Sequence, residues 1–209
     1  MPATKSRLRI TEVDGSPSKR AVALKLPNGT LIDNGDGTVS FEPITLPFTL
    51  TASGGWPSTT SGCASPAKSE SSSNKQNIVT LDFDKDSDEY AEWTVPSMPS
   101  NWDGLTFTAK FKWTAAAGTA TETVKFYLQA RAYANDDAVD QAWGTAVGVE
   151  GALITVGDVH ETSATAAITA AGTPAAGQML QIRVYRDVSE DTLAADAKLL
   201  GVLIDYGTV

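Results

Sequence analysis

Apolar and polar residues alternate strictly along much of this chain, and this alternation limits the folds that it can adopt. In "LTFTAKFKW", residues 105–113, and in "VKFYLQARAY", residues 124–133, apolar side chains occupy every second position. Because successive side chains of a strand point to opposite faces, each segment predicts a strand with one buried face. Six further segments complete a set of eight predicted strands: "NIVTLDF", "YAEWTV", "ALITV", "ATAAIT", "LQIRVY" and "LLGVLIDY". The last is apolar on both faces around Leu199 to Ile204, which suits a more central strand.

Eight strands of this kind need either two packed sheets or a closed barrel. The connections at residues 115–121 and 134–145 are long, which suits strands that cross between two sheets. We therefore predict an all-β fold, an antiparallel jelly-roll β-sandwich with an N-terminal β-hairpin arm. The helical pattern is weak, and "NDDAVDQAW", residues 135–143, predicts a short helix or a turn.

The hairpin is predicted by "NGTLIDNGDGTVSF", in which "DNGDG" separates two short apolar runs. A lone hairpin is marginally stable, so Leu31, Ile32, Val39 and Phe41 are expected to find partners elsewhere and to form an attachment element. Three parts of the chain follow from this interpretation. They are an N-terminal β arm at 1–51, a Ser-rich linker or long loop at 52–76, and the jelly roll at 77–209.

Charge and composition exclude several classes of protein. The net charge of −9 argues against nucleic acid as the main partner, although residues 1–26 carry six Lys and Arg against two carboxylates. Hydrophobic residues make up 42% of the chain, which is enough for a core. The N-terminal sequence has no apolar secretory signal, and no apolar run predicts insertion into a membrane. We expect the protein to be made and folded in a cytosol.

No constellation of catalytic residues stands out. His160 is the single histidine and lies in the polar sequence "GDVHETS", so a surface position is expected. Cys63, the single cysteine, lies in the Ser-rich segment with no cation before Lys68, so nothing predicts an activated thiolate. One histidine and one cysteine make a zinc site very unfavourable, and no metal or cofactor is expected.

An acidic run, "DFDKDSDEY", places Asp82, Asp84, Asp86 and Asp88 at alternate positions. Oxygen ligands at every second residue are typical of a calcium loop, but the glycine and the final glutamate of such loops are missing here. An acidic strand end that faces water is the simpler interpretation, and binding of a cation stays open.

The polar faces of two predicted strands carry tyrosines and arginines: Tyr127, Arg131, Tyr133, Arg183 and Tyr185. Tyr and Arg are enriched at the centres of subunit interfaces, so we prefer an interface as the interpretation of this surface. A glycan-binding surface is the alternative, because exposed aromatic rings beside polar side chains also suit sugars. Trp93 and Trp113 lie on apolar faces and are expected in the core.

Several stretches of the chain resemble small structural proteins in the virions of tailed bacteriophages. The stretches are "RITEVDGSPS", "LPNGTLIDNGDGTVSF", "NWDGLTFTAKFKWTA", "LQARAYANDDAVDQAWGTA" and "RVYRDVSEDTLAADAKLLGVLIDY". They cover nearly the whole chain, and the Ser-rich segment matches least. The resemblance carries no catalytic motif. It implies a virion component made in the host cytoplasm, trimeric, with an N-terminal attachment segment and a C-terminal jelly roll.

Three hypotheses for function remain. The first is a non-enzymatic virion protein, a trimeric appendage such as a short tail fibre or a head decoration protein, with capsid or tail proteins as partners. The second is a carbohydrate-binding module that recognises a glycan on the host surface. The third is a small polysaccharide-degrading enzyme, which would need two facing carboxylates in a groove.

Overall fold

The structure, a computed structural model, describes residues 29–33, 35, 39–43 and 45–208. These residues divide into two compact units, with the boundary between Glu42 and Pro43. The first unit contains β1 (Gly29–Asp33) and β2 (Val39–Pro43), which pair as a two-stranded sheet. The predicted strands of the hairpin are therefore confirmed, and Gly35 between them adopts a φ of +75°.

The attachment role of this hairpin stays a prediction. Ile32 is 37% exposed. The side chains of Leu31, Val39 and Phe41 lie outside the described residues.

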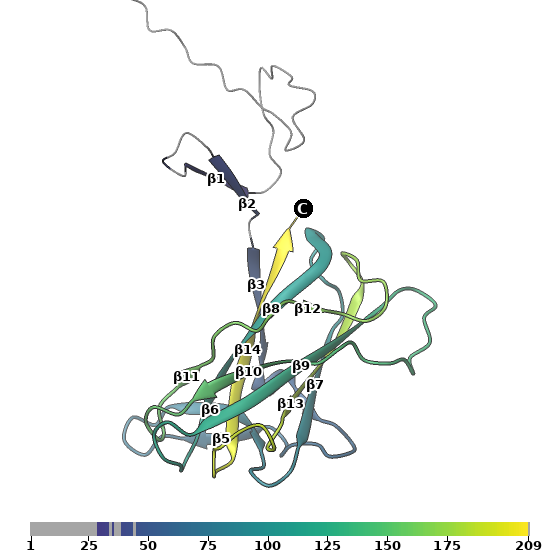
Figure 1. Cartoon of the computed structure of the whole chain (residues 1–209). Coiled ribbons are helices and arrows are strands. Elements are labelled where there is room, and N and C mark those ends of the chain that lie inside the picture. Colours follow the sequence, from purple (N-terminus) through teal and green to yellow (C-terminus); the bar gives the residue numbers. More distant parts are fainter. Residues whose placement is uncertain (1–28, 34, 36–38, 44, 209) are drawn as a thin grey trace, which may run out of the picture. The chain divides into compact units, whose positions relative to one another are not determined.

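The second unit is an all-β sandwich of jelly-roll type, built from two antiparallel sheets (Figure 1). The five-stranded sheet has the order β10-β9-β13-β7-β4, and the seven-stranded sheet has β11-β8-β14-β6-β5 with β12 beside β8 and β3 beside β14. Consecutive strands from β6 to β9 alternate between the sheets. The strands are β3 (Thr45–Thr51), β4 (Trp56–Pro57), β5 (Ala67–Glu70), β6 (Asn77–Phe83), β7 (Glu89–Val95), β8 (Trp102–Thr114), β9 (Thr123–Tyr133), β10 (Val147–Ala152), β11 (His160–Glu161), β12 (Ile168–Thr169), β13 (Met179–Arg186) and β14 (Ala197–Thr208).

The core lies between the two sheets, where the apolar faces predicted from the alternation meet. Phe126 on β9 stacks on Phe111 of β8, with ring centroids 5.2 Å apart, and contacts Phe83 of β6 edge-on at 5.8 Å. Trp93 and Trp113 are buried, as expected. These large side chains supply apolar area from both sheets, and its removal from water is the main force that holds the sandwich together.

The domain boundary predicted at residue 51 is wrong. Residues 45–51 form β3, which pairs with β14 and places Leu50 opposite Val202 in the core. The Ser-rich segment is not a linker, because Cys63 is buried and its amide donates to the carbonyl oxygen of Tyr90. The Ser-rich composition conceals this order, because backbone amides of Ser58, Cys63 and Ala64 hold the segment by hydrogen bonds to carbonyl oxygens of Tyr90 and Asp82.

Some local predictions also differ from the structure. Residues 134–146 contain turns and no helix, and they connect β9 to its neighbour β10 rather than crossing between sheets. The strand predicted at "ALITV" is displaced, since β10 ends at Ala152 and Ile154 is 73% exposed. Only the 3-10 turn η1 (Ala52–Gly54) is helical within the described residues. Accordingly, no helix found there is long and apolar enough to cross a membrane.

A buried arginine closes one end of the sandwich. Arg186, at the end of β13, is fully buried and forms a two-point ion pair with Asp191, with contacts of 2.7 and 3.1 Å. The same guanidinium donates to the carbonyl oxygens of Phe83, Asp84, Leu193 and Ala195. Arg186 therefore ties β13 to the end of β6 and to the loop before β14.

Candidate functional site

The outer face of the five-stranded sheet carries the polar side chains that the sequence singles out. Tyr127 on β9 and Tyr185 on β13 are register partners, and so are Tyr185 and Tyr90 of β7. Side chains at paired positions project from the same face, so the three tyrosines form one row across three strands. We call Tyr90, Tyr185 and Tyr127 the tyrosine row.

The rings of the tyrosine row cover one another. Tyr127 and Tyr185 are parallel within 7° at a centroid distance of 5.0 Å, and Tyr90 lies 5.1 Å from Tyr185. Gly148, the partner of Tyr127 on β10, leaves room for this arrangement, because a Cβ there would lie 2.6 Å from the Tyr127 ring. Since the rings stack on one another, their faces are partly used within the row and are less available to stack on a ligand.

Hydrogen bonding and burial keep the phenols of Tyr127 and Tyr185 protonated. Tyr127 donates a 2.6 Å hydrogen bond to Glu190, and this carboxylate raises the pKa of Tyr127 to about 12. The pKa of Tyr185 is also raised, first by burial and then by its tyrosine neighbour Tyr90. Neither tyrosine is suited to act as a base at neutral pH.

A second row of paired side chains runs beside the first. Trp56 of β4 pairs with Glu92 of β7, Glu92 with Arg183 of β13, and Arg183 with Gln129 of β9. We call these four residues the polar row. Its members alternate in chemistry across the strands: an indole, a carboxylate, a guanidinium and an amide.

The two charged groups of the polar row are held by neutral partners. Glu92 accepts hydrogen bonds from Ser58 at 2.7 Å and Gln181 at 3.2 Å, and Arg183 donates two to Gln129 at 2.7 and 3.2 Å. Within residues 45–208, neither charge takes part in an ion pair. Each therefore keeps hydrogen-bonding capacity for a ligand.

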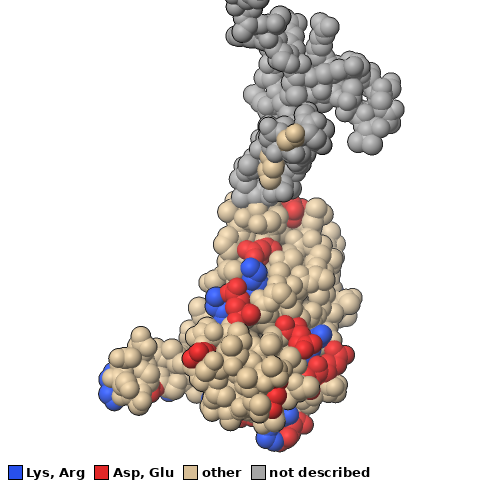
Figure 2. Space-filling view, turned by 60° about the vertical axis from the view of Figure 1, so that its left-hand side comes forward, with Lys and Arg blue, Asp and Glu red and all other residues tan. Residues whose placement is uncertain are grey.

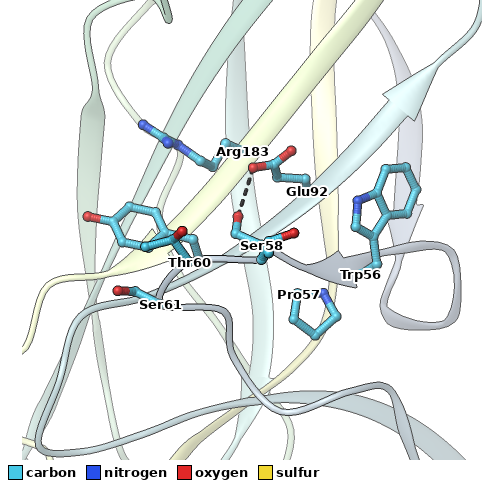
Figure 3. Close-up of a pocket in the computed structure, with 9 residues that line it drawn as sticks. Trp56, Pro57, Ser58, Thr60, Ser61, Glu92 and Arg183 are labelled. Carbon is cyan, nitrogen blue, oxygen red and sulfur yellow. Dashed lines mark hydrogen bonds between the residues drawn. The ribbon is translucent and has the colours of Figure 1, made fainter.

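A hollow of about 600 Å³ opens where the polar row meets residues 56–61 (Figure 3). Glu92 lies between Trp56 on one side and Arg183 on the other. It accepts a hydrogen bond from the hydroxyl of Ser58. The Trp56 side is open, because this residue is 45% exposed. The hollow thus combines one accessible aromatic surface with a carboxylate, a guanidinium and hydroxyl groups.

The loop at 134–146 folds back onto the same face and adds a second tryptophan. Arg183 lies between two rings, with its Cζ 4.9 Å from the centroid of Tyr90 and 4.7 Å from that of Trp143. Gln129 donates to the carbonyl oxygen of Gly144 at 3.0 Å, which fixes the end of the loop. Trp143 thereby becomes part of the face although it lies in no strand.

The five residues predicted for this surface are not all together. Tyr127, Tyr185 and Arg183 lie in the two rows, whereas Arg131 and Tyr133 lie farther along β9. Arg131 donates to Gln141, and the Tyr133 hydroxyl donates to the carbonyl oxygen of Val139. Both residues therefore bind the loop at 134–146 and do not line the hollow.

Sequence reasoning missed Trp56, Tyr90, Glu92 and Trp143 as members of the face. Two of these had a usable signal, because alternation in "YAEWTV" puts Tyr90 and Glu92 opposite the buried Trp93.

Other candidates for chemistry resolve into structural roles. His160 is buried, not at the surface as expected, and packs against Trp113 at a centroid distance of 5.0 Å. Its Nε2 lies 3.0 Å from the carbonyl oxygen of Thr155, an acceptor, so this nitrogen carries the proton. The prediction failed because β11 pairs with β8 and brings His160 onto Trp113.

The acidic run is dispersed among protein partners. Asp82 binds Lys198 and Thr80, Asp86 binds Lys85, and Asp88 accepts from the amide of Val188. Within the part of the chain that the structure describes, no group of three or more His, Cys, Asp or Glu could hold a metal ion.

No protein-family model matches the chain, and no curated protein matches its sequence. Among solved structures, one similar protein is a CBM28 carbohydrate-binding module described as specific for non-crystalline cellulose. It shares 9% identity at a TM-score of 0.39, over 74% of this chain and 85% of that one. Another is TmCBM27, a carbohydrate-binding module described for specific mannan recognition, with 9% identity and a TM-score of 0.39 over 80% and 99% of the two chains. Likenesses this distant carry no argument about the ligand of the present chain.

Proposed function

We propose that the sandwich is a non-enzymatic glycan-binding module and that the outer face of its five-stranded sheet binds the sugar. The observation that carries this proposal is the hollow in which the exposed Trp56, the carboxylate of Glu92 and the guanidinium of Arg183 converge. Ligand sites in proteins are typically concave, with a few polar groups converging on an aromatic lining.

The chemistry of this hollow suits a sugar. A pyranose ring has apolar C–H faces and a rim of hydroxyl groups that both donate and accept hydrogen bonds. The indole of Trp56 can take a C–H face, Glu92 can accept from hydroxyls, and Arg183 can donate to them. Because Glu92 and Arg183 lie side by side on adjacent strands, they could bond to neighbouring hydroxyls of one ring and so fix its orientation.

The same hollow argues against hydrolysis of the glycan. Glycosidases use two carboxyl groups that face each other across the scissile bond. Glu92 is the only acidic residue among the nine that line the hollow. We therefore propose binding without catalysis.

A glycan array followed by calorimetry tests this function. We expect the intact chain to bind at least one class of neutral glycan, and Trp56→Ala to weaken that binding by about tenfold through loss of the aromatic contact. Leu105→Ala is the matched control, because Leu105 is 65% exposed on β8 of the other sheet. Absence of binding to every glycan on the array would overturn the proposal.

We also propose that this module is carried on a phage virion as a trimeric appendage. The sequence resemblance supports this setting, and so does the division of the described chain into a hairpin unit and a sandwich unit. Light scattering should give the mass of a trimer, and a stable monomer would count against it. A chain that lacks residues 1–42 should fold but fail to join virions; normal incorporation would exclude the hairpin unit as the anchor.

A subunit interface remains the competing use of the tyrosine and polar rows. An interface through this face would bury Trp56 and Arg183 in the trimer, so Arg183→Ala would change the oligomeric mass. A glycan site predicts that the mass stays constant and that only sugar binding is lost.

A further inference from the structure

The polar row runs across the strands rather than along them, and this direction sets the length of a ligand. Trp56, Glu92, Arg183 and Gln129 lie on four adjacent strands, β4, β7, β13 and β9. Neighbouring strands are about 4.8 Å apart, so three intervals span about 14 Å, the length of about three pyranose rings in a chain. The row is therefore longer than one sugar.

Aromatic rings mark both sides of the arginine at the centre of this row. Trp56 lines the 600 Å³ hollow on the β4 side, and Trp143 covers the guanidinium of Arg183 from the loop side. A second hollow, of about 450 Å³, is lined by Trp143 together with Thr145, Val147 and Thr169. Trp143 therefore lies next to both hollows, because it lines the second one and contacts Arg183 of the first.

The charges of the site favour an uncharged ligand. Glu92 and Arg183 are register partners on adjacent strands, so a negative and a positive charge lie side by side in the hollow. An anionic sugar would gain from Arg183 but would be repelled by Glu92, and a cationic sugar would meet the reverse. Figure 2 shows one face of the molecule, on which acidic side chains predominate and basic ones lie among them, so the surroundings add no attraction for an anionic sugar.

We propose that the site takes an extended, uncharged oligosaccharide that lies across the strands, with Trp56 and Trp143 as the two aromatic contacts and Arg183 as the hydrogen-bonding centre between them. This inference rests on the proposed glycan-binding function. It adds that the interior of a polysaccharide chain is recognised, rather than a terminal sugar.

Calorimetry with oligosaccharides of increasing length tests the proposal on the full chain. The probes are glucose, mannose and xylose oligomers from monomer to hexamer, with galacturonate and glucosamine oligomers as the anionic and cationic counterparts. For a neutral series, we expect affinity to rise up to a trimer or tetramer and then to level off. We also expect added salt to change this affinity little, since no net charge is neutralised.

Two variants distinguish the ends of the site. Trp143→Ala should weaken tetramer binding by about tenfold, whereas dimer binding at Trp56 should change little. Trp143→Phe, which keeps an aromatic ring, should restore most of the tetramer affinity. Thermal unfolding of each variant checks that the sandwich is intact. Equal losses for dimer and tetramer in Trp143→Ala would overturn the assignment of a second aromatic contact.

The outcomes separate this inference from the function on which it rests. A monomer that binds as tightly as the hexamer, or tightest binding to a charged series, overturns the extended neutral ligand and leaves glycan binding standing. Failure of every probe in this set, together with a silent glycan array, overturns both.

Discussion

Arg186 forms the buried ion pair of the sandwich, and the stability of the protein depends on this pair. Its ion pair with Asp191 is buried, with 0% and 3% of the two side chains exposed, whereas the Lys75–Glu70 pair is 68% and 49% exposed. Removal of one partner from a buried pair leaves an uncompensated charge in a medium of low dielectric constant. Exposed pairs are hydrated and screened, and they contribute little.

We expect Asp191→Ala to lower the free energy of unfolding by about 3–5 kcal/mol, because Arg186 then keeps its charge but loses its counter-ion. Urea denaturation followed by tryptophan fluorescence measures the change. Glu70→Ala is the control and should cost less than about 1 kcal/mol. Similar losses for the two substitutions would mean that the hydrogen bonds from Arg186 to backbone carbonyl oxygens are enough to stabilise its buried charge.

Cys63 makes stability depend on pH at the alkaline side. Burial, and then the nearby carboxylate of Glu89, raise the pKa of the Cys63 thiol to about 12. In the unfolded chain a thiol ionises at about 8.5. Between these values the unfolded state loses the proton first, so its free energy falls relative to the folded state as pH rises.

The free energy of unfolding should therefore decrease above about pH 9, by up to about 1.4 kcal/mol per pH unit from this group. Below the unfolded pKa the contribution of Cys63 is fully retained. Urea denaturation of the native chain and of Cys63→Ala at several alkaline pH values isolates the contribution of this thiol to the free energy of unfolding. All other titrating groups are the same in the two proteins. Parallel curves for the two proteins would contradict a buried thiol.

At the scale of elements, the strands with clean alternation could be predicted, and the segments that complete the face could not. β8, β9, β13 and β14 follow from their own residues, because each has one apolar face wide enough to be read locally. β4 is only two residues long, and it is ordered by a partner distant in sequence, since Glu92 of β7 lies opposite Trp56. The candidate site depends partly on this pairing. Its residues on β7, β9 and β13 could be found from alternation, whereas Trp56 and Trp143 could not.

The loop at 134–146 is the element that the site most requires to be in place. Gly144 lies against two backbone oxygens, since a Cβ there would come within 2.8 Å of the carbonyl oxygens of Ala130 and Thr169. Backbone atoms cannot yield as the end of a flexible side chain can. The loop would have to move, and Trp143 would move with it.

We expect Gly144→Ala to destabilise the protein by about 1–3 kcal/mol and to speed hydrogen exchange of the loop amides. Oligosaccharide binding should fall as it does for Trp143→Ala. The control is Gly54→Ala, whose nearest neighbour is the Thr51 hydroxyl at 3.3 Å, a group that can adjust. Unchanged exchange in the loop of the Gly144 variant would show that another contact positions it.

At the scale of the whole molecule, the boundary between the two units gives a sharp test of what belongs to the sandwich. Removal of residues 1–42 takes away the hairpin unit and leaves every strand of the sandwich. Removal of residues 1–51 also deletes β3, and with it the buried Leu50 and the contact of Phe48 with Tyr206.

The shorter truncation should leave the unfolding midpoint of the sandwich unchanged. The longer truncation should lower the free energy of unfolding by about 3 kcal/mol or more, because it removes the apolar side chains of β3. Burial of each large apolar side chain contributes about 1.5–3 kcal/mol. Thermal and urea denaturation of the two shortened chains provide the comparison. Equal stabilities would mean that β3 is an accessory to the sandwich rather than a part of it.

The position of β14 in the chain has a consequence for folding during synthesis on the ribosome. β14 is the last strand of the sandwich to be synthesised, yet β8, β6 and β3 all pair with it. The seven-stranded sheet therefore cannot close until β14 has left the ribosome, and until then the apolar faces of β6 and β8 lack their central partner. Chains of this topology form their longest-range contacts last, and until those contacts form the exposed apolar faces favour aggregation.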